Sequence, residues 1–436
     1  MKLRAAVRQF IPKKLLNLRH LFYAWLGAVR YGHPSEELLV IGVTGTSGKS
    51  TTVYLLRQLL EHAGYTVGSL STIDFYVAGK DKLNDQKMTM LGKMQIQKYL
   101  RDMVTKGCNI AIIETTSEGR VQYRHRFINY DMMVLTNLYP EHIDSHGSFE
   151  NYMQAKIDIF DYVAKCKQKV LGGKHVEKTA IINREVKGYT KFLAGTFDGV
   201  VEFGGNAKLH VENVETKQDG IHFTVHSREF HVSMFGEHNV INIFACMAVA
   251  RALDIPWSTI QEAVARFRNV PGRLEFISEA EQFGFQVIVD YAFEPEAMKK
   301  LYDVVDVLDP VRVIHVFGST GGGRDVSRRK ILGEYIGTNA DICYVTDEDP
   351  YDDDPMTIME DVARAVERVG KRRGYTLIVE PDRAKAIHSA VMAAENGDVV
   401  LITGKGSEQA IVAKGVLIPW DDRTIVKECL NSIRTV

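Results

Sequence analysis

Residues 38–52 read LLVIGVTGTSGKSTT, a short apolar run that breaks into a glycine-rich turn and then into a helix-like pattern. The glycines let successive backbone N–H groups point toward one centre, and the following helix adds its positive N-terminal end. Lys49 suits the outer phosphates of a nucleotide, and the Ser50 hydroxyl suits Mg²⁺. A plain glycine turn would leave Lys49 unexplained. The stretch therefore predicts a nucleoside triphosphate site formed by Gly45, Thr46, Ser47, Gly48, Lys49, Ser50 and Thr51.

Length and composition are typical of a globular chain. With 436 residues and 45% hydrophobic content, the chain is long enough to form two or three domains with large cores. Lys and Arg total 54 against 55 Asp and Glu, so the net charge gives no reason to expect a nucleic acid partner. The 5 cysteines are scattered and form no C-x-x-C pair. We therefore expect reduced thiols, a cytoplasmic location and no thiolate zinc site.

The N-terminal segment, residues 1–37, differs from the rest of the chain. It is rich in cations and aromatic residues and has no acid before Glu36. Charged residues interrupt the apolar pattern too often for a membrane-spanning helix, and no small-residue cleavage site is present. Such a basic amphipathic helix either lies on an anionic membrane surface or packs on its own domain or on a second subunit. Its cations are Lys2, Arg4, Arg8, Lys13, Lys14, Arg19 and Arg30.

Beyond this segment, short apolar runs alternate with helical patterns, as in parallel sheets covered by helices. Residues 200–234 read instead as short alternating strands, which predicts a small antiparallel sheet appended to the first domain. Helical periodicity stops at residues 269–273, NVPGR. The expected fold class is therefore α/β, with a central P-loop ATP-binding domain at residues 38–270 and a Rossmann-like C-terminal domain at residues 271–436. First-domain strands are expected at residues 67–69, 110–113, 132–135 and 179–182, and a helix at 238–253.

The C-terminal half repeats the pattern of apolar strands that end in polar loops. A doubly wound sheet binds ligands at the carboxyl ends of its strands, so this half is expected to hold a second ligand. The glycines of residues 318–323 lack the G-x-G-x-x-G spacing, and Arg324 and Asp325 follow them, which disfavours a dinucleotide site for hydride transfer. The strands are expected at residues 286–290, 311–317, 342–346 and 399–403.

Two further clusters accompany the phosphate loop. An apolar strand pattern ends on Glu114, a usual place for a carboxylate that meets Mg²⁺. After the next strand, His142, Asp144 and His146 form an H-x-D-x-H pattern. Alone, this pattern would suit zinc, but the phosphate loop makes magnesium the more economical metal.

More motifs follow in order along the chain. They are T-N-L-x-x-[DE]-H-x-D-x-H-G-x-x-E-x-Y-x-x-A-K at residues 136–156, G-x-x-N-x-x-N at 236–242, P-G-R-x-E at 271–275, D-Y-A at 290–292, G-x-R-D at 322–325, D-R-x-x-A-I at 382–387 and G-K-G-x-E at 404–408. With the phosphate loop and Glu114, this series resembles the Mur ligase family, and within it the MurE branch. The resemblance runs from about Leu38 to the C-terminus.

The resemblance implies an ATP-dependent, ADP-forming ligase of peptidoglycan biosynthesis. In this family an acceptor carboxylate attacks the γ-phosphate of ATP, and an amino group then displaces phosphate from the acyl phosphate. Lys49 and two Mg²⁺ ions would neutralise the charge. By position, Ser50 would bind one Mg²⁺. The other would be held by Glu114, His142 and Lys156, with Lys156 as a carbamate formed with CO₂.

The same resemblance places ATP between the two domains, near Asn242, Arg273 and Asp290. Closure of the C-terminal domain would complete the site and exclude water from the acyl phosphate.

Departures from the family pattern concern the acceptor. MurE ligases begin with a separate UDP-binding domain, whereas the phosphate-loop strand begins near Leu38 here, so we expect that domain to be absent. Residues 88–91 read MTML in place of the family's T-T-P segment, which also weakens the case for a UDP-linked acceptor. A muramoyl-peptide-type acceptor is expected at Ser117, Gln122 and Arg124, and a lipid-linked acceptor is the alternative.

The amino-acid site departs from the family pattern as well. The D-N-P-R motif of diaminopimelate-adding members is replaced by Asp349-Pro350-Tyr351 within an acid-rich loop, which favours lysine or ornithine. An ordinary solvated acidic loop is the alternative reading. Ser407 and Phe293 stand where histidines are usual. The residues expected to hold the amino acid are Arg324, Asp349, Tyr351 and Glu408.

Other functions fit part of the pattern. A folylpolyglutamate or poly-γ-glutamate ligase, or a pseudomurein peptide ligase, would share the phosphate loop and the modified lysine. A non-catalytic ATP-binding protein is a further alternative, although it would be expected to lose its metal-binding residues. The residues that the resemblance assigns to the metal, Glu114, His142 and Lys156, are all present, which disfavours this alternative.

Overall fold

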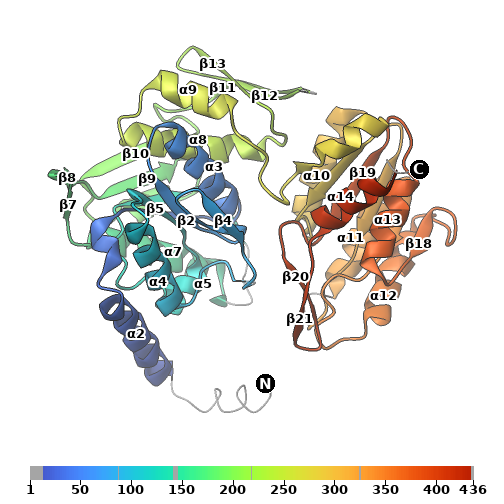
Figure 1. Cartoon of the computed structure of the whole chain (residues 1–436), viewed down its shortest axis with the longest axis horizontal. Coiled ribbons are helices and arrows are strands. Elements are labelled where there is room, and N and C mark those ends of the chain that lie inside the picture. The colour runs from blue at the N-terminus through green and yellow to red at the C-terminus, as the bar shows by residue number, and fades with distance from the viewer. Residues whose placement is uncertain (1–12, 87, 141–145, 218, 324–325, 434–436) are drawn as a thin grey trace. The chain divides into compact units, whose positions relative to one another are not determined.

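The computed structural model describes residues 13–433 apart from 87, 141–145, 218 and 324–325 (Figure 1). The chain divides into two compact units. The first comprises residues 1–215, 222–232 and 237–267, and the second comprises residues 216–221, 233–236 and 268–436. The domain boundary expected after residue 270 remains a prediction.

An eight-stranded sheet forms the centre of the first unit. The strands β10-β9-β6-β1-β5-β2 run parallel in this order, and β3 and β4 extend the β2 edge in antiparallel fashion. Val43 lies opposite Glu114, so β1 and β5 end at the same edge of the sheet. The strands are β1 (Leu39–Thr44), β2 (Val67–Leu70), β3 (Asp74–Val77), β4 (Lys80–Leu83), β5 (Ile110–Glu114), β6 (Met132–Leu135), β9 (Thr179–Asn183) and β10 (Gly199–Phe203).

Helices cover both faces of this sheet (Figure 1). On one face α3 packs against α8, and on the other α4 and α7 supply Leu100 and Phe160 to a core that includes Ile113 of β5. The predicted α/β class is confirmed here, because buried strands alternate with amphipathic helices. The helices are α3 (Lys49–His62), α4 (Lys93–Thr105), α5 (Ser117–Val121), α7 (Phe149–Ala164), α8 (His238–Ala252) and α9 (Trp257–Ala265), with 3₁₀ turns η1 (Pro34–Glu37) and η2 (Tyr189–Leu193).

The predicted antiparallel sheet over residues 200–234 is wrong at its first strand. β10 pairs in parallel with β9 and so belongs to the main sheet, where its last residue, Phe203, is buried. The small sheet holds only the later strands, in the order β11-β12-β13. His226 and Ser227 join the last two through a turn in which both residues have positive φ. The strands are β11 (Glu212–Lys217), β12 (Gly220–Val225) and β13 (Arg228–Val232), and a separate hairpin pairs β7 (Lys169–Leu171) with β8 (Lys174–Val176).

The N-terminal helix α2 (Lys13–Arg30) packs along α4 of the first unit. After the helix ends, Arg101 of α4 holds the chain by donating to the carbonyls of Tyr31 at 2.8 Å and Gly32 at 2.9 Å. The expectation of packing on its own domain therefore holds for one side of α2. Among the described residues, no helix has both the length and the apolarity needed to cross a membrane.

A six-stranded sheet forms the centre of the second unit, in the order β14-β15-β19-β16-β17-β18. All neighbours are parallel except β14, which pairs antiparallel with β15. The strands are β14 (Glu275–Phe276), β15 (Gln286–Asp290), β16 (Val313–Phe317), β17 (Ile342–Val345), β18 (Leu377–Val379) and β19 (Val399–Thr403), and a separate hairpin joins β20 (Ala410–Ala413) to β21 (Val416–Pro419).

Alternate strand residues of this sheet face two different cores. Val313 and Leu401 pack with α10, α11 and α12, whereas Ile314 and Ile402 pack with α13 and α14. The second unit is thus the doubly wound sheet that the sequence predicts. Its helices are α10 (Pro295–Leu308), α11 (Ser327–Asn339), α12 (Pro355–Arg368), α13 (Arg383–Met392) and α14 (Asp422–Ile433), with the 3₁₀ turn η3 (Ser278–Phe283).

Candidate active site

The phosphate loop connects β1 to α3. Gly48, directly before α3, has a φ of +74°, a left-handed conformation that favours glycine. A Cβ there would lie 2.1 Å from Asn242 Oδ1, and a Cβ at Gly45 would lie 2.0 Å from Thr136 Oγ1. Both positions therefore require glycine. This geometry brings backbone N–H groups and the N-terminus of α3 together, as anion binding needs.

Two side chains, Asn137 and Lys49, form hydrogen bonds with the backbone of this loop. Asn137 Oδ1 accepts hydrogen bonds from the amides of Thr46 at 3.0 Å and Ser47 at 2.9 Å. Lys49 Nζ donates to the carbonyls of Gly45 at 3.2 Å and Thr46 at 2.8 Å. A phosphate would compete for these donors, because charged acceptors form the stronger hydrogen bonds. Sequence reasoning gave Asn137 no role, although the T-N-L motif contains it.

Glu114 ends β5 beside the loop and is 2% exposed. Its Oε2 accepts hydrogen bonds from the Ser50 hydroxyl at 2.9 Å and from the amide and hydroxyl of Thr72 at 2.7 and 3.0 Å. A buried carboxylate and a hydroxyl at the start of a phosphate-binding helix are oxygen ligands of the kind that Mg²⁺ prefers. Ser50 and Glu114 therefore fit a magnesium ion, and Thr72 is a supporting residue that sequence reasoning missed.

Lys156 reaches the same loop from α7 and is 1% exposed. Its Nζ donates to the Gly45 carbonyl at 2.8 Å and lies 4.6 Å from the centre of the Tyr152 ring. The Tyr152 hydroxyl in turn donates to Thr46 Oγ1 at 3.1 Å. The helix begins at Ser148, whose side chain accepts from the Asn151 amide at 3.2 Å. The cap thus helps to fix the helix that carries Lys156.

Two of the residues expected near the metal, His142 and Asp144, lie outside the described residues. His146, the next residue of that pattern, has its Nε2 3.1 Å from the hydroxyl of Ser117. The structure therefore connects His146 to Ser117, one of the expected acceptor residues.

The expected acceptor residues gather around α5. Arg124 donates to Gln122 Oε1 from Nη2 at 2.8 Å and from Nε at 3.2 Å, and its Nη1 donates to the Met90 carbonyl. Burial lowers the pKa of Arg124. The residues that differ from the family's T-T-P segment thus contact an expected substrate-binding arginine.

Asn242 lies on α8 against the phosphate loop. Its Oδ1 accepts from Thr52 Oγ1 at 3.3 Å, and its Nδ2 donates to Asn239 Oδ1 at 3.1 Å. Asn242 is therefore placed by the loop and by the first asparagine of the G-x-x-N-x-x-N motif. Its contact with adenine remains a prediction.

In the second unit, Arg273 and Asp290 lie together with Tyr291. Asp290 accepts the backbone N–H groups of Leu274 and Ala292, each at 2.7 Å. Burial raises the pKa of Asp290, and the positive charge of Arg273 acts against that rise. The Arg273 guanidinium lies 4.1 Å from the centre of the Tyr291 ring. This cation–π contact orients Arg273.

Lys405 contacts two of the residues expected to hold the amino acid, Asp349 and Glu408. Sequence reasoning gave Lys405 no role. It is 0% exposed, and its Nζ donates to Asp349 Oδ1 at 3.0 Å and to Glu408 Oε2 at 2.7 Å. Asp349 Oδ1 also accepts the Val412 amide at 2.7 Å, and the Tyr291 hydroxyl donates to Glu408 at 3.2 Å. The carboxylates of Asp349 and Glu408 therefore share one buried cation, Lys405.

The other two expected amino-acid residues are placed differently. Arg324 lies outside the described residues. Tyr351 has a φ of +54° and packs on the glycine-rich loop, where a Cβ at Gly322 would lie 3.0 Å from its Cγ. Its ring thus covers the loop that leads into Arg324.

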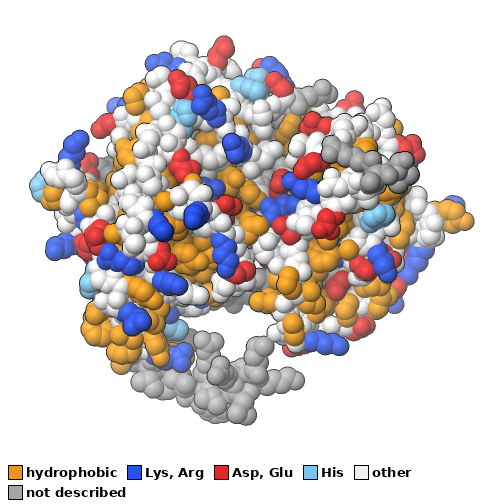
Figure 2. All heavy atoms as spheres, in the orientation of Figure 1, with side chains coloured by type: hydrophobic (Ala, Val, Ile, Leu, Met, Phe, Trp, Pro, Cys, Tyr) orange, Lys and Arg blue, Asp and Glu red, His pale blue; other side chains and the backbone are white. Residues whose placement is uncertain are grey.

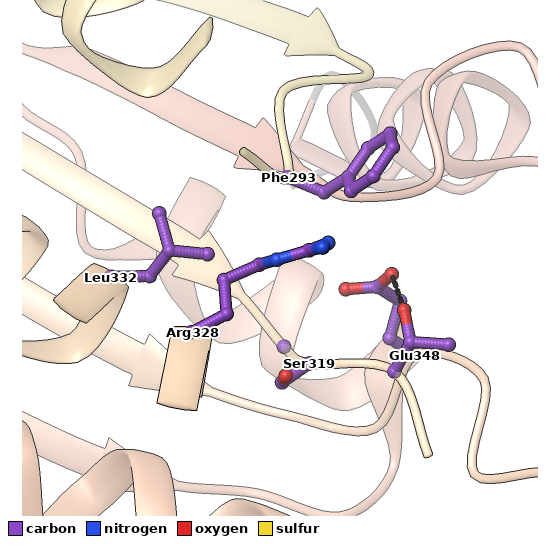
Figure 3. Close-up of a pocket in the computed structure, with 7 residues that line it drawn as sticks. Phe293, Ser319, Arg328, Leu332 and Glu348 are labelled. Atoms are coloured by element: carbon purple, nitrogen blue, oxygen red, sulfur yellow. Dashed lines mark hydrogen bonds between the residues drawn. The ribbon is translucent and has the colours of Figure 1, made fainter. Parts of the chain in front are cut away.

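A small pocket opens at the carboxyl ends of β16 and β17 (Figure 3). Arg328 points into it toward Glu348, and the Arg328 guanidinium lies 5.6 Å from the centre of the Phe293 ring. Thr320 Oγ1 donates to Glu348 Oε1 at 3.0 Å, and burial raises the pKa of Glu348. The pocket is lined by Phe293, Gly318, Ser319, Thr320, Arg328, Leu332 and Glu348. Arg328 Nη1 also pairs with Glu294 Oε1 at 3.0 Å, so the cavity is faced by an ion-paired arginine and a buried glutamate.

Comparison with known proteins decides the family. Residues 43–250 match the Mur ligase middle domain, and residues 272–406 match the Mur ligase, glutamate ligase domain. The UDP-N-acetylmuramyl-tripeptide synthetase of Roseiflexus sp. (strain RS-1) is 35% identical over 418 residues, which cover 94% of this chain and 81% of that protein. The chain belongs to the Mur ligase family. The resemblance drawn from its motifs is therefore confirmed.

A second relative is also a ligase of the MurE type. The UDP-N-acetylmuramoyl-L-alanyl-D-glutamate--2,6-diaminopimelate ligase of Clostridium botulinum (strain ATCC 19397 / Type A) is 31% identical, over 92% of this chain and 80% of that protein. A solved structure of a ligase of the same name has a TM-score of 0.62 at 23% identity and covers 91% of this chain and 79% of its own, which shows the shared fold.

Mur ligases are ATP-dependent, Mg²⁺-requiring enzymes that form ADP, and they act on small-molecule substrates. This chain is a ligase of that kind. The roles of the individual residues described above remain predictions.

Proposed function

We propose that this ligase joins an amino acid to the free carboxylate of a muramoyl-peptide-type acceptor in the cytoplasm, as a step in cell-wall biosynthesis. The observation that carries the proposal is the meeting of Ser50, Glu114 and Lys156 at one phosphate loop. Their elements are distant in sequence, yet all three side chains are buried at the place where a triphosphate would lie. A simple nucleotide-binding protein has no need for this set.

The chain's own groups account for activation of the carboxylate. The loop amides and Lys49 would hold the β- and γ-phosphates, and Lys49 would leave its present carbonyl partners for them. Magnesium held by Ser50 and Glu114 would neutralise charge on the phosphates. With its charge neutralised, the γ-phosphate accepts attack by the acceptor carboxylate, which gives an acyl phosphate and ADP. The amino group then attacks the acyl carbon, and phosphate leaves with the carboxylate oxygen.

Lys156 is the proposed site of modification by CO₂. As an ammonium it would repel a second cation at the phosphate loop, whereas a carbamate would attract one. Its Nζ lies 2.8 Å from the Gly45 carbonyl, within the loop itself. We therefore infer a second Mg²⁺ site that uses a carbamylated Lys156, with Glu114 and His142 as further ligands.

The acceptor is proposed to lie along α5. Ser117 and Arg124 supply a hydroxyl and a guanidinium there, with Gln122 between them. A guanidinium suits a carboxylate or a phosphate of the acceptor because it can donate two parallel hydrogen bonds.

The amino acid is proposed to bind in the pocket of the second unit. Arg328 would exchange its present partner Glu294 for the carboxylate of the amino acid, and Glu348 would meet an ammonium group. Asp349 and Glu408 lie at the same strand ends and share one cation, Lys405, which offsets one of their two negative charges. Together with Glu348, these acids could favour a basic side chain. Lysine and ornithine are therefore the proposed amino acids.

A phosphate-release assay tests the function directly. The full chain is incubated with ATP, Mg²⁺, one acceptor and one amino acid, drawn from a panel of muramoyl dipeptides, folates and glutamate chains. We expect release that requires a muramoyl dipeptide and a basic amino acid together. Release that depends on folate or glutamate chains would overturn the proposed acceptor, and nucleotide binding with no release under any condition would overturn catalysis.

A further inference from the structure

The N-terminal helix α2 presents two different faces. Along one face, Ala24 and Ala28 are 1% and 0% exposed, and the helix packs against α4. Gly27 lies on this face, where a Cβ would come within 3.2 Å of Met94 Cα. The close approach of the two helices commits this face to the first unit.

The opposite face of α2 is apolar and exposed. Leu18, Phe22, Trp25 and Val29 follow one another at spacings of four, three and four residues, which align them along one side of a helix. They are 63%, 52%, 45% and 46% exposed, and the rings of Phe22 and Trp25 lie 5.9 Å apart. Figure 2 shows hydrophobic side chains gathered over α2, with Lys and Arg side chains next to them. We name these four residues the apolar stripe.

Positive charge borders the apolar stripe. Arg19 and Arg30 are exposed and lie eleven positions apart, which places them on the same side of the helix. No acidic residue occurs in the sequence before Glu36, whereas five further cations precede Arg19. They are Lys2, Arg4, Arg8, Lys13 and Lys14.

Positive charge extends from α2 to α4 within the first unit. Lys93 Nζ lies 2.9 Å from His20 Nδ1. Burial, together with the charges of Arg124 and Arg19, lowers the pKa of Lys93 to about 8. Cationic groups therefore run from the exposed helix toward Arg124, one of the proposed acceptor residues.

Charge decides between two possible occupants of the apolar stripe. A second copy of the chain would bring two cation-rich helices together without an acid between them, which is repulsive. An anionic phospholipid surface supplies the opposite charge, and its headgroup region is where Trp and Tyr side chains such as Trp25 and Tyr23 are favoured.

We propose that α2 docks this protein on an anionic phospholipid membrane, with the apolar stripe in the headgroup boundary and Arg19 and Arg30 on the lipid phosphates. The helix would lie in the plane of the surface, since its other face stays on α4. The inference goes beyond the ligase activity and does not depend on it.

Vesicle sedimentation of the full chain tests the proposal. Vesicles of phosphatidylcholine alone are compared with vesicles that also contain phosphatidylglycerol. One cation near an anionic surface contributes about 1 kcal/mol, or about a fivefold change in partitioning. We therefore expect at least tenfold stronger binding to the anionic vesicles and a loss of about 25-fold in the double variant Arg19→Gln with Arg30→Gln.

The stripe itself is tested by the double variant Phe22→Ser with Trp25→Ser. The matched control is Val416→Ser with Leu417→Ser on β21, where the parent residues are 60% and 50% exposed. Thermal melts followed by circular dichroism establish that each variant is folded. We expect at least tenfold weaker binding in the stripe variant and parental binding in the control.

Three outcomes would overturn the proposal. Equal binding to neutral and anionic vesicles would remove the electrostatic part, and equal binding of the stripe variant and the control would remove the apolar part. A two-chain mass by light scattering that becomes a one-chain mass in the stripe variant, without vesicle binding, would assign the stripe to a second copy instead. None of these readouts involves catalysis, so they leave the proposed ligase function to its own assay.

Discussion

At the scale of single residues, the proposed chemistry depends on groups that the fold buries at one loop. Glu114 and Lys156 meet the backbone and side chains of the phosphate loop from β5 and α7. Burial makes such groups costly unless they have partners, so their presence at a nucleotide site indicates function rather than stability.

Removal of the Lys156 amine tests its role. We expect Lys156→Ala to lower kcat by about 100-fold or more, the usual cost of losing a group that stabilises developing charge. Lys165→Ala is the matched control, because Lys165 is exposed at the end of the same helix. Initial rates of phosphate release measure both variants. Partial rescue of Lys156→Ala by short carboxylic acids would support the carbamate, and a parental rate in that variant would contradict the assigned role.

His315 is a buried histidine whose hydrogen bonds connect β16 to neighbouring elements of the second unit. Its Nδ1 lies 2.9 Å from the Tyr302 hydroxyl and its Nε2 lies 3.0 Å from Thr403 Oγ1, and burial lowers the pKa of His315 from 6.5 to about 3. Below pH 6.5 the histidine is protonated in the unfolded chain but stays neutral in the folded chain. The free energy of unfolding therefore decreases as the pH is lowered.

The expected effect of His315 between pH 7 and pH 5 is a loss of about 2 kcal/mol in the free energy of unfolding. His315→Gln keeps hydrogen-bonding groups but removes the titration, so its stability should fall by about 2 kcal/mol less over the same range. Urea denaturation at the two pH values measures the difference. Identical pH dependence in the parent and the variant would show that His315 does not remain neutral in the folded state.

At the scale of elements, the sequence predicted the strands better than their pairing. The runs at residues 286–290 and 399–403 match β15 and β19, since continuous apolar runs bounded by turns are typical of buried parallel strands. β10 was misplaced because alternation within residues 200–203 describes a strand but not its neighbour, which here is β9.

At the site as well, the sequence predicted local motifs better than contacts between distant residues. The glycines, lysine and serine of the phosphate loop were legible in the sequence because spacing alone defines the motif. Asn137 and Lys405 were not, because their roles depend on where the fold brings them: Asn137 onto the loop amides, and Lys405 between two carboxylates. Contacts between residues distant in sequence leave no local pattern.

Glycine substitutions separate the strain of the loop from its contacts. Gly48 and Gly64 both have positive φ, but a Cβ at Gly64 meets nothing within 4 Å, whereas one at Gly48 would meet Asn242. Left-handed backbone costs alanine about 1 kcal/mol at either position. We expect Gly64→Ala to lower stability by that amount only, and Gly48→Ala to lower it further and to weaken binding of an ATP analogue at least tenfold.

Urea denaturation and fluorescence titration measure these two effects. Gly64→Ala serves as the control for backbone strain. Parental nucleotide affinity in Gly48→Ala would mean that the contact between the loop and α8 does not shape the phosphate site.

At the scale of the whole molecule, the proposed chemistry is divided between two units. The phosphate loop and the acceptor residues belong to the first, and the pocket of Arg328 and Glu348 belongs to the second. A substitution in the pocket should therefore change the use of the amino acid without changing the binding of nucleotide.

Glu348→Gln tests this division. We expect the KM for a basic amino acid to rise about tenfold, because a charged hydrogen bond contributes about 1.5 kcal/mol or more, while the affinity for an ATP analogue stays at the parental value. Glu395→Gln on the surface of the same unit is the control, since its side chain is 79% exposed. Steady-state kinetics and nucleotide titration supply the two readouts. A matched loss of nucleotide affinity would contradict the division.

In the proposed mechanism, ATP activates an acceptor carboxylate at the loop that Glu114 and Lys156 contact. Its most direct test uses an acceptor whose carboxylate carries ¹⁸O, followed by mass analysis of the released phosphate. If an acyl phosphate forms, one ¹⁸O atom from the carboxylate leaves with each phosphate as the amide is made. Phosphate without ¹⁸O would mean that water attacks ATP and would contradict the account.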